Sequence, residues 1–384
     1  MKTIRPISVN LSLIIISIVT SILVAEFALR FTDYSSLSIS QAFPQYHFKA
    51  DEELGYDISE NFSGEHNFPE YPYKIFSNKY NCFDYERPVP ENYILTVGDS
   101  YTWGYTPLEK KWTTRVEHLS EIFMLKCGIT GFGTKQELIK TKRVVQQVGH
   151  APKFIMLMYV SNDINDDLAY PQRTVLNGHL VNSVKNVDLT NGVVTHYSEA
   201  ELRKRYAKYM SDTLAGYLRN LRYKSILYRL YRTKVQPYLK QTRSKQASNS
   251  FNFISPAYAE DLNEHMPSHM ADEIYSVRLI SYLDRHDIPW YNQLITAHKD
   301  NLHEFVRYSR SIGAELLLVD ICGCLTHDRL QSVTTMKGVY YYDLTNDYPY
   351  SVSSRWEFDG HWNIQGNQEA ANYIYRHYSN VGVF

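Results

Sequence analysis

The sequence predicts an α/β protein in which helices cover a central parallel sheet. Short apolar, β-prone runs alternate with longer segments of helical period, both before residue 170 and after residue 290. Strands of a parallel sheet are buried on both faces, so they read as nearly continuous apolar runs. Because helices connect such strands, this alternation is typical of a sheet with covering helices.

The first half of the pattern supplies three strands and two helices. We expect the strands at the apolar runs YILTV, FML and FIMLMYV, which occupy residues 93–97, 123–125 and 154–160. One helix follows Thr113, with Val116 and Leu119 on one face, and the other spans residues 134–148.

The same alternation resumes near the C-terminus. Residues 292–311 and 365–378 are expected to be helical, and residues 315–319 and 339–344 to be strands. An insertion of roughly residues 171–290 separates the two halves of the pattern.

Residues 199–245 of this insertion are basic and helix-prone, and they carry a stripe of Leu and Ile. One interpretation is an interaction helix for anionic lipid headgroups or acidic polysaccharide. The other is a solvated helix that packs its apolar stripe on the main domain. We favour the second, because charge runs usually mark a solvated face. Residues 241–260 are rich in Ser, Asn, Gln and Ala and are expected to form a loop.

A long apolar stretch at residues 9–31 predicts a membrane segment, because it approaches the roughly 20 residues that span a bilayer. A cleaved signal peptide would prefer an A-x-A arrangement, whereas Ala25 and Ala28 stand three residues apart. A buried core helix is a third interpretation, which the position at the extreme N-terminus disfavours. We favour an uncleaved anchor, with Lys2 and Arg5 on the cytoplasmic side and the body periplasmic or extracellular.

These boundaries divide the chain into an anchor, 1–32, a connector, 33–90, and a main domain, 91–384, which contains the insertion. The net charge of −1 gives no general attraction to nucleic acid, so we expect no such partner. The 14 His are scattered without an HExxH pattern, and we expect neither a metal nor a cofactor. The 33 Tyr suit either half-buried packing or clefts that stack on sugars.

Four cysteines are present, and they form no zinc-type CxxC pair. A long-range disulfide between Cys82 and Cys127 is compatible with the sequence. Cys322 and Cys324 have poor spacing for a mutual disulfide, because one residue alone separates them.

The strongest local signal is GDSYTWG, in which Ser100 directly follows the first strand. Ligands of open α/β sheets gather at the carboxyl ends of strands. A serine at a strand-to-helix turn there can present both its hydroxyl and its backbone N–H to a substrate. Taken alone, the tripeptide Gly98-Asp99-Ser100 is equally compatible with a capped turn.

A histidine near the other end of the chain supplies the base that such a serine needs. His361 lies in FDGHWN, just before the last expected helix, and Asp359 stands two residues before it. A hydroxyl nucleophile needs a base of near-neutral pKa, and the base needs a carboxylate that fixes its tautomer. A surface turn with an Asp cap is the alternative for this segment.

Two further segments supply hydrogen-bond donors for a developing oxyanion. The glycine-rich GITGFG, residues 128–133, follows the second strand, and Asn162 follows the third. Each such donor typically contributes about 3 kcal/mol of transition-state stabilisation. Each segment would also suit an ordinary turn.

The ordered set GDSYTWG, GITGFGT, SNDIND and DGHWN resembles the blocks of the SGNH (GDSL-type) hydrolases. The resemblance covers roughly residues 90–170 and 300–384. It implies a three-layer α/β/α flavodoxin-like fold, with the insertion outside the minimal fold.

The same resemblance assigns roles to five residues. It implies that Ser100 is the nucleophile, His361 the general base and acid, and Asp359 the residue that orients the histidine. The oxyanion hole would combine the N–H groups of Ser100 and Gly131 with the Asn162 side chain.

The acid–base block departs from the family's D-x-x-H pattern, because here it reads D-x-H, as in membrane-anchored members. Glu357 is a weak substitute for Asp359, and Gly128 is an alternative to Gly131 as the oxyanion donor.

Three functions remain open at this point. The first is a serine esterase that removes an acyl group, commonly acetyl, from an envelope carbohydrate. The second is an O-acyltransferase that passes the same acyl group to an extracytoplasmic polysaccharide, because both reactions share an acyl-serine intermediate. The third is a non-catalytic cell-surface binding or assembly protein.

Overall fold

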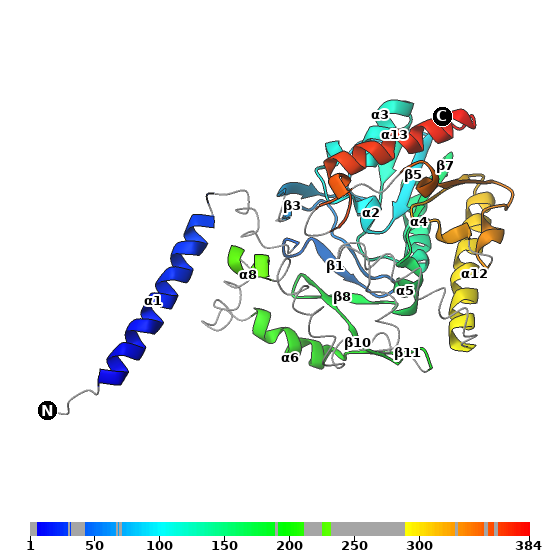
Figure 1. Ribbon diagram of the computed structural model, residues 1–384. Helices are drawn as coiled ribbons and strands as arrows, with labels where there is room; N and C mark the ends of the chain where they lie inside the picture. The colour runs from blue at the N-terminus through cyan, green and yellow to red at the C-terminus, as the bar shows by residue number, and fades with distance from the viewer. Residues whose placement is uncertain are drawn as a thin grey trace. The chain divides into compact units, whose positions relative to one another are not determined.

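The structure is a computed structural model (Figure 1). The chain divides into two compact units. The first contains the N-terminal helix and part of the insertion, and the second contains the sheet. The structure describes residues 6–29, 31, 43–66, 68, 71–188, 191–210, 225–231, 289–326, 329–348, 352–356 and 360–384.

Five parallel strands form the central sheet of the second unit, in the order β13-β12-β7-β5-β6. Apolar side chains bury both faces, which is why each strand reads as a continuous apolar run. The strands are β5 (Tyr93–Gly98), β6 (Phe123–Lys126), β7 (Phe154–Tyr159), β12 (Glu315–Asp320) and β13 (Val339–Asp343). The predicted parallel sheet is therefore confirmed, with each strand where the sequence places it.

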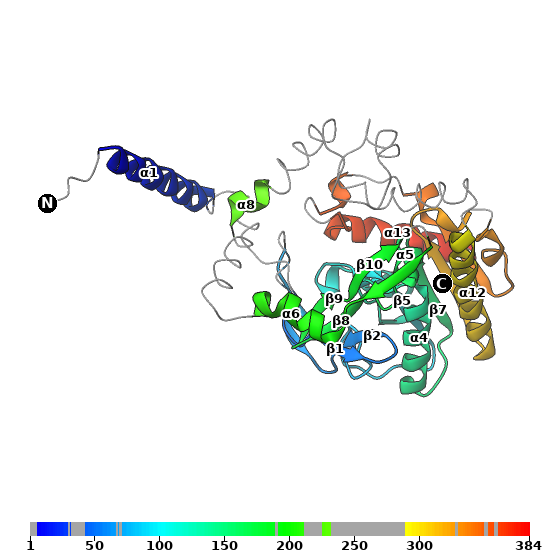
Figure 2. The ribbon, with the colours of Figure 1, turned by 90° about the horizontal axis from the view of Figure 1, so that it is seen from below.

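Two pairs of helices cover the two faces of this sheet (Figure 1 and Figure 2). Leu138 of α4 and Leu302 of α12 belong to one apolar core, together with Leu95 of β5. Val116 of α3 and Ile374 of α13 belong to the other. The helices are α3 (Trp112–Ser120), α4 (Thr134–Val148), α12 (Pro289–Ser311) and α13 (Ile364–Asn380).

Alternate residues of each strand serve the two cores, so the arrangement is three-layered, as the resemblance implies. In β5, Leu95 joins one core and Ile94 the other. Fully burying a side chain of this size stabilises the fold by about 1.5–3 kcal/mol. Within the described residues, helix α12 already includes Pro289, three residues before its predicted start.

Four antiparallel hairpins surround this core. Two lie in the predicted connector: β1 (Phe48–Asp51) with β2 (Gly55–Ile58), and β3 (Ser63–His66) with β4 (Tyr73–Phe76). Two open the insertion: β8 (Arg173–Leu176) with β9 (His179–Asn182), and β10 (Val184–Asp188) with β11 (Val193–His196).

The remaining elements are short. The helices are α2 (Ser100–Trp103), α5 (Asp163–Leu168), α6 (Glu199–Met210) and α8 (Ile226–Leu230). Turns of 3-10 helix occupy Leu108–Lys110, Cys324–Thr326, Gln331–Val333, Leu344–Asn346 and Val352–Ser354. Most of the basic stretch predicted at residues 199–245, and the whole loop predicted at residues 241–260, lie outside the described residues.

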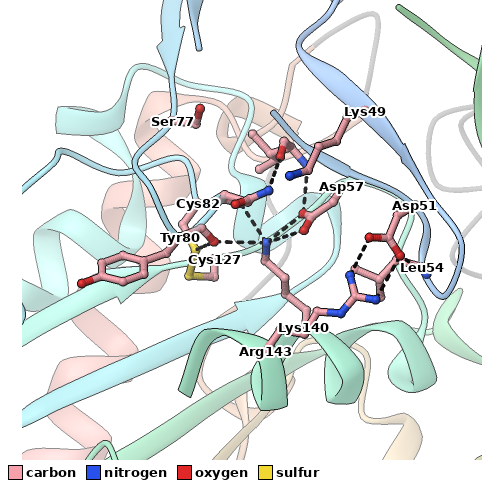
Figure 3. Close-up of polar contacts among 12 residues, drawn as sticks. Lys49, Asp51, Leu54, Asp57, Ser77, Tyr80, Cys82, Cys127, Lys140 and Arg143 are labelled. Carbon is pink, nitrogen blue, oxygen red and sulfur yellow. Dashed lines mark hydrogen bonds and ion pairs between the residues drawn. A yellow bond between two sulfur atoms is a disulfide. The ribbon is translucent and has the colours of Figure 1, made fainter. Parts of the chain in front are cut away.

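A buried ion pair joins helix α4 to the hairpin β1–β2 (Figure 3). The Lys140 ammonium donates to both carboxylate oxygens of Asp57, at 2.7 and 3.0 Å, and to the carbonyl oxygens of Asn81 and Tyr80, at 2.9 and 3.3 Å. Burial lowers the pKa of Lys140, and the Asp57 charge opposes that shift. The hairpin is thus fixed to the helix that follows the candidate oxyanion segment.

Two disulfides are formed. Cys82 pairs with Cys127, at the end of β6, as the sequence allows. Cys322 also pairs with Cys324, which contradicts the expectation of poor spacing. The reason is the intervening Gly323, whose φ of 66° turns the backbone so that the two side chains meet.

Helix α1 (Pro6–Leu29) belongs to the first unit. Its segment Ser12–Leu29 has a mean hydropathy of 2.3, and none of it is buried. By length and composition it is able to cross a membrane, and a signal sequence has the same properties. Within the same unit, the Glu26 carboxylate accepts hydrogen bonds from the N–H groups of Ile226 and Leu227, so it caps α8.

Candidate active site

The turn between β5 and α2 positions Ser100. Gly98 has a φ of 148°, and a side chain there would meet Thr102 Oγ1 at 2.1 Å, so the turn requires glycine. Asp99 caps α2, because its carboxylate accepts the Tyr101 N–H at 2.9 Å. Ser100 is the first residue of α2, and its side chain is nearly buried. The Ser100 N–H stands at a helix start, where no intrahelical acceptor exists.

The structure brings Ser100 and His361 together, although 261 positions separate them along the chain. His361 Nε2 lies 2.8 Å from Ser100 Oγ, within hydrogen-bonding distance. The imidazole lies near the rings of Tyr101 and Tyr105, with centroids 4.9 and 4.5 Å away. Aromatic packing on this imidazole restricts its rotation and keeps Nε2 directed at the serine.

Arg355 holds the loop that carries His361. Its buried guanidinium donates to the Gly360 carbonyl oxygen at 2.8 Å and to the Tyr101 hydroxyl at 3.2 Å. The His361 carbonyl oxygen accepts the Trp356 N–H at 2.8 Å. These bonds fasten the histidine loop to helix α2, which begins with Ser100.

The two carboxylates proposed to orient the histidine, Asp359 and Glu357, lie outside the described residues. The role of Asp359 therefore stays a prediction of the sequence.

Asp99 is a residue of the site that the sequence analysis assigned only to a cap. Its Oδ2 accepts the Ser100 hydroxyl at 3.0 Å and the Asn162 amide at 3.2 Å. Burial raises the pKa of Asp99, while the Tyr101 N–H and the nearby His361 oppose the shift. The available signal was its place beside Ser100 at a strand end, where a side chain faces the ligand edge of the sheet.

The Asn162 side chain is joined to Ser100 through Asp99. The Nδ2 group of Asn162 donates to Asp99 Oδ2 at 3.2 Å and to Asp166 Oδ2 at 2.8 Å. Both amide protons are thus directed at carboxylates. Donation to a substrate oxygen requires that one of these two bonds be exchanged.

Gly131 lies in a backbone conformation that favours glycine, with a φ of 76°. Its carbonyl oxygen accepts the Gln172 side chain at 2.7 Å, and the preceding Thr130 carbonyl accepts the Tyr56 hydroxyl at 2.7 Å. Among the described residues, the Gly131 N–H has no hydrogen-bond acceptor. That N–H is therefore available to a ligand.

The alternative donor, Gly128, is also tightly packed. A side chain at this position would meet Thr102 at 2.5 Å, so the glycine allows the loop to pack on α2. The backbone geometry explains why both positions are glycine. The assignment of Gly131, and not Gly128, as the oxyanion donor stays a prediction.

Buried carboxyl groups lie around the site. Burial raises the pKa of Asp166 to about 7, and the Asn162 hydrogen bond opposes that shift. Burial also raises the pKa values of Asp163 and Glu137 well above their usual range, and neighbouring carboxyls add to both shifts. The carboxyls around the site thus favour their neutral forms more than exposed carboxyls do.

Within the described ranges, one group of residues brings three metal-type ligand atoms close together: Asp320, Cys322 and Cys324. The two cysteines are joined in a disulfide, so Asp320 is the one member with an ionisable group.

A serine hydroxyl hydrogen-bonded to a histidine, at the end of a parallel strand and beside free backbone N–H groups, is the arrangement of serine hydrolases. By sequence, the chain matches no family model and no curated protein.

Among solved structures, the chain is similar to a G-D-S-L family protein from Desulfitobacterium hafniense DCB-2, with 10% identity, a TM-score of 0.35, and coverage of 74% of this chain and 99% of that one. It is also similar to an acetyl xylan esterase, Est2A, from the rumen bacterium Butyrivibrio proteoclasticus, with 9% identity, a TM-score of 0.38, and coverage of 78% and 66%.

Proposed function

We propose that this chain is a serine esterase that forms an acyl-enzyme on Ser100. The observation that carries the proposal is the 2.8 Å contact between His361 Nε2 and Ser100 Oγ. A serine hydroxyl is a weak nucleophile until a base takes its proton, and an imidazole at this distance is such a base.

In the first half-reaction, His361 Nε2 takes the proton while Ser100 Oγ bonds to the ester carbonyl carbon. The negative charge that develops on the carbonyl oxygen is stabilised by the N–H groups of Ser100 and Gly131 and by the Asn162 amide. The imidazolium then protonates the departing alkoxide. Asp359, as the sequence predicts, holds the imidazole in the tautomer that this step needs.

In the second half-reaction, His361 activates an acceptor hydroxyl that releases the acyl group. If water is the acceptor, the protein is an esterase; if a sugar hydroxyl is, it is an O-acyltransferase. We propose hydrolysis of acetyl esters on an envelope carbohydrate as the activity. We further propose that α1 anchors the body on the outer side of the membrane.

The test is a rapid-mixing assay with p-nitrophenyl acetate on the full-length protein. We expect a burst of p-nitrophenolate and an acetyl group on the peptide that contains Ser100. Ser100→Ala should abolish both. Ser161→Ala is the matched control, because Ser161 is also a buried serine two residues past the end of a sheet strand, and it should retain both.

Added oligosaccharide then separates the candidate functions. Release of free acetate supports the esterase, whereas an acetylated sugar selects the acyltransferase. Absence of both burst and turnover from a folded wild-type protein would contradict an enzymatic role and leave the binding protein.

A further inference from the structure

Arg173 lies against the candidate oxyanion segment. It is the first residue of β8, and its guanidinium occupies the place that a side chain of Gly131 would take. A Cβ built on Gly131 would lie 3.0 Å from Nη1 and 3.1 Å from Cζ of this arginine. The absence of a side chain at residue 131 therefore makes room for a cation next to the N–H that is available to a ligand.

This cation has no fixed counter-ion in the described part of the chain. The Arg173 guanidinium forms no hydrogen bond and no ion pair there, and the residue is only partly exposed. A partly desolvated charge without a partner is costly, so buried arginines are normally paired with carboxylates. Arginine cannot relieve that cost by losing its proton.

The groups close enough to act on its charge are Tyr56, Tyr105 and Asp166. Each already has another partner: Tyr56 donates to the Thr130 carbonyl, Tyr105 shares a hydrogen bond with the Thr130 hydroxyl, and Asp166 accepts from Asn162. Because burial raises the pKa of Asp166 to about 7, that carboxyl is only partly ionised at neutral pH. These neighbours raise the pKa of Arg173 against the effect of burial, but none of the three forms a hydrogen bond or an ion pair with its guanidinium in the described part of the chain.

Tyr105 connects this cation to the reacting pair. Its hydroxyl lies 2.7 Å from Thr130 Oγ1, next to Gly131, and its ring centroid lies 4.5 Å from that of His361. Because the guanidinium lies against Gly131, a ligand bound to the Gly131 N–H lies near this cation as well.

We propose that Arg173 binds a carboxylate of the substrate, so that the site selects acyl esters of carboxylate-bearing sugars, such as uronic acids. A planar guanidinium matches a carboxylate with two parallel hydrogen bonds. A single arginine balances a single negative charge, which favours a carboxylate over a phosphate dianion. This inference rests on the esterase function proposed above and names the substrate class of that site.

The test compares three substrates: acetylated oligogalacturonate, the same oligosaccharide with its carboxylates methyl-esterified, and p-nitrophenyl acetate. We expect the wild type to show a kcat/KM about 10- to 100-fold higher on the anionic sugar than on its methyl ester, which is the range for a hydrogen-bonded charge. Arg173→Gln should abolish this preference by raising KM for the anionic sugar, with a much smaller change on the methyl ester and on p-nitrophenyl acetate, and Arg173→Lys should retain part of the preference.

Arg307→Gln is the matched control, because it removes an exposed arginine from α12. It should leave the preference for the anionic sugar intact. Thermal unfolding of each variant checks that it is folded.

Three outcomes would overturn the inference in an active enzyme. The wild type could treat the two sugars alike, Arg173→Gln could lower kcat equally on all three substrates, or the control could lose the preference as well. The second outcome would assign Arg173 to oxyanion stabilisation or to the fold.

A binding measurement separates failure of this inference from failure of the esterase. Unacetylated oligogalacturonate is titrated into Ser100→Ala and into the double variant Ser100→Ala/Arg173→Gln. Tighter binding by the first, by about 10-fold or more and weakened by salt, supports carboxylate recognition even if no ester is cleaved. Equal affinity would overturn it.

Discussion

At the residue scale, the Ser100 hydroxyl has one proton and two acceptors within reach. His361 Nε2 lies 2.8 Å away and Asp99 Oδ2 lies 3.0 Å away. A proton taken by the imidazole produces a cation beside the Asp99 carboxylate, which stabilises it. Asp99 therefore favours transfer of the proton to His361, in addition to capping α2.

Asp166 makes the stability of the fold depend on pH. Burial raises its pKa from 3.8 to about 7, so the folded chain holds a proton that the unfolded chain loses between those values. The free energy of unfolding should therefore fall as the pH rises from about 4 to 7. At 1.36 kcal/mol per unit of pKa, this one group contributes at most about 4 kcal/mol.

Asp166→Asn should remove this contribution and keep an acceptor for the Asn162 amide. Urea unfolding at pH 4 and pH 8 should show that the wild type loses more stability than the variant over that interval. Asp300→Asn, which changes an exposed aspartate, should follow the wild type. Parallel profiles for the wild type and Asp166→Asn would contradict the argument.

Gly131→Ala tests the close approach of Arg173. The new Cβ would meet the guanidinium at 3.0 Å in a backbone conformation that disfavours side chains. We expect a loss of stability of about 1–3 kcal/mol, together with lower esterase activity. Gly149→Ala is the matched control, because Gly149 has a φ of 87° with nothing within 4 Å.

The control should lose stability from backbone strain alone and keep its activity. If both variants lose the same stability and both retain activity, Gly131 is needed for its backbone conformation and not for the close approach of Arg173.

At the element scale, the Lys140–Asp57 pair fixes α4 to the hairpin β1–β2. Lys140→Met should reduce the free energy of unfolding by about 3–5 kcal/mol, because it leaves the Asp57 charge buried without a partner. Denaturant titration measures this change. Lys142→Met should cost less than about 1 kcal/mol, because Lys142 and its partner Glu304 are both exposed.

A double variant separates the charge from the packing. If the stranded Asp57 charge causes the loss, Lys140→Met with Asp57→Leu should recover much of it. If the double variant recovers no stability, the loss in Lys140→Met comes from the packing of the lysine side chain and not from the Asp57 charge.

The sequence predicted the buried strands of the sheet and missed the hairpins. The strands of the sheet were predictable because burial on both faces leaves an apolar run, as in Phe154–Tyr159. The hairpin β8–β9 was missed, although its turn, Asn177-Gly178, carries a hairpin signature, with φ values of 49° and 77°.

For the site, the sequence placed Ser100, His361, Gly131 and Asn162 near one another because each follows or precedes an element of the sheet. The position of Arg173 could not be predicted in this way. It depends on how an insertion hairpin packs against residue 131, and no local period or motif encodes that contact.

At the scale of the whole molecule, α1 is either retained or removed. We predict that it is retained as an anchor, because Ser12–Leu29 is long enough to span a bilayer and the A-x-A arrangement of a cleavage site is absent from the sequence around Ala25 and Ala28. The protein isolated from membranes should then have an intact mass that includes residues 1–31. A mass that lacks them would identify a signal peptide.

The complete site assembles segments from both ends of the main domain. Ser100 lies after β5, and His361 lies before α13. The contact between them therefore forms only when the N-terminal and C-terminal halves of the domain are both folded. Activity should therefore report on the folded second unit as a whole.

The measurement that tests this account most directly is reaction of the full-length protein with a fluorophosphonate, followed by peptide mass mapping. An activated serine is expected to react, so the adduct should lie on Ser100 in the wild type and in Ser161→Ala. It should be absent from Ser100→Ala and from His361→Ala. A folded wild-type protein that remains unlabelled, or an adduct that persists in Ser100→Ala, would contradict the claim that His361 activates Ser100.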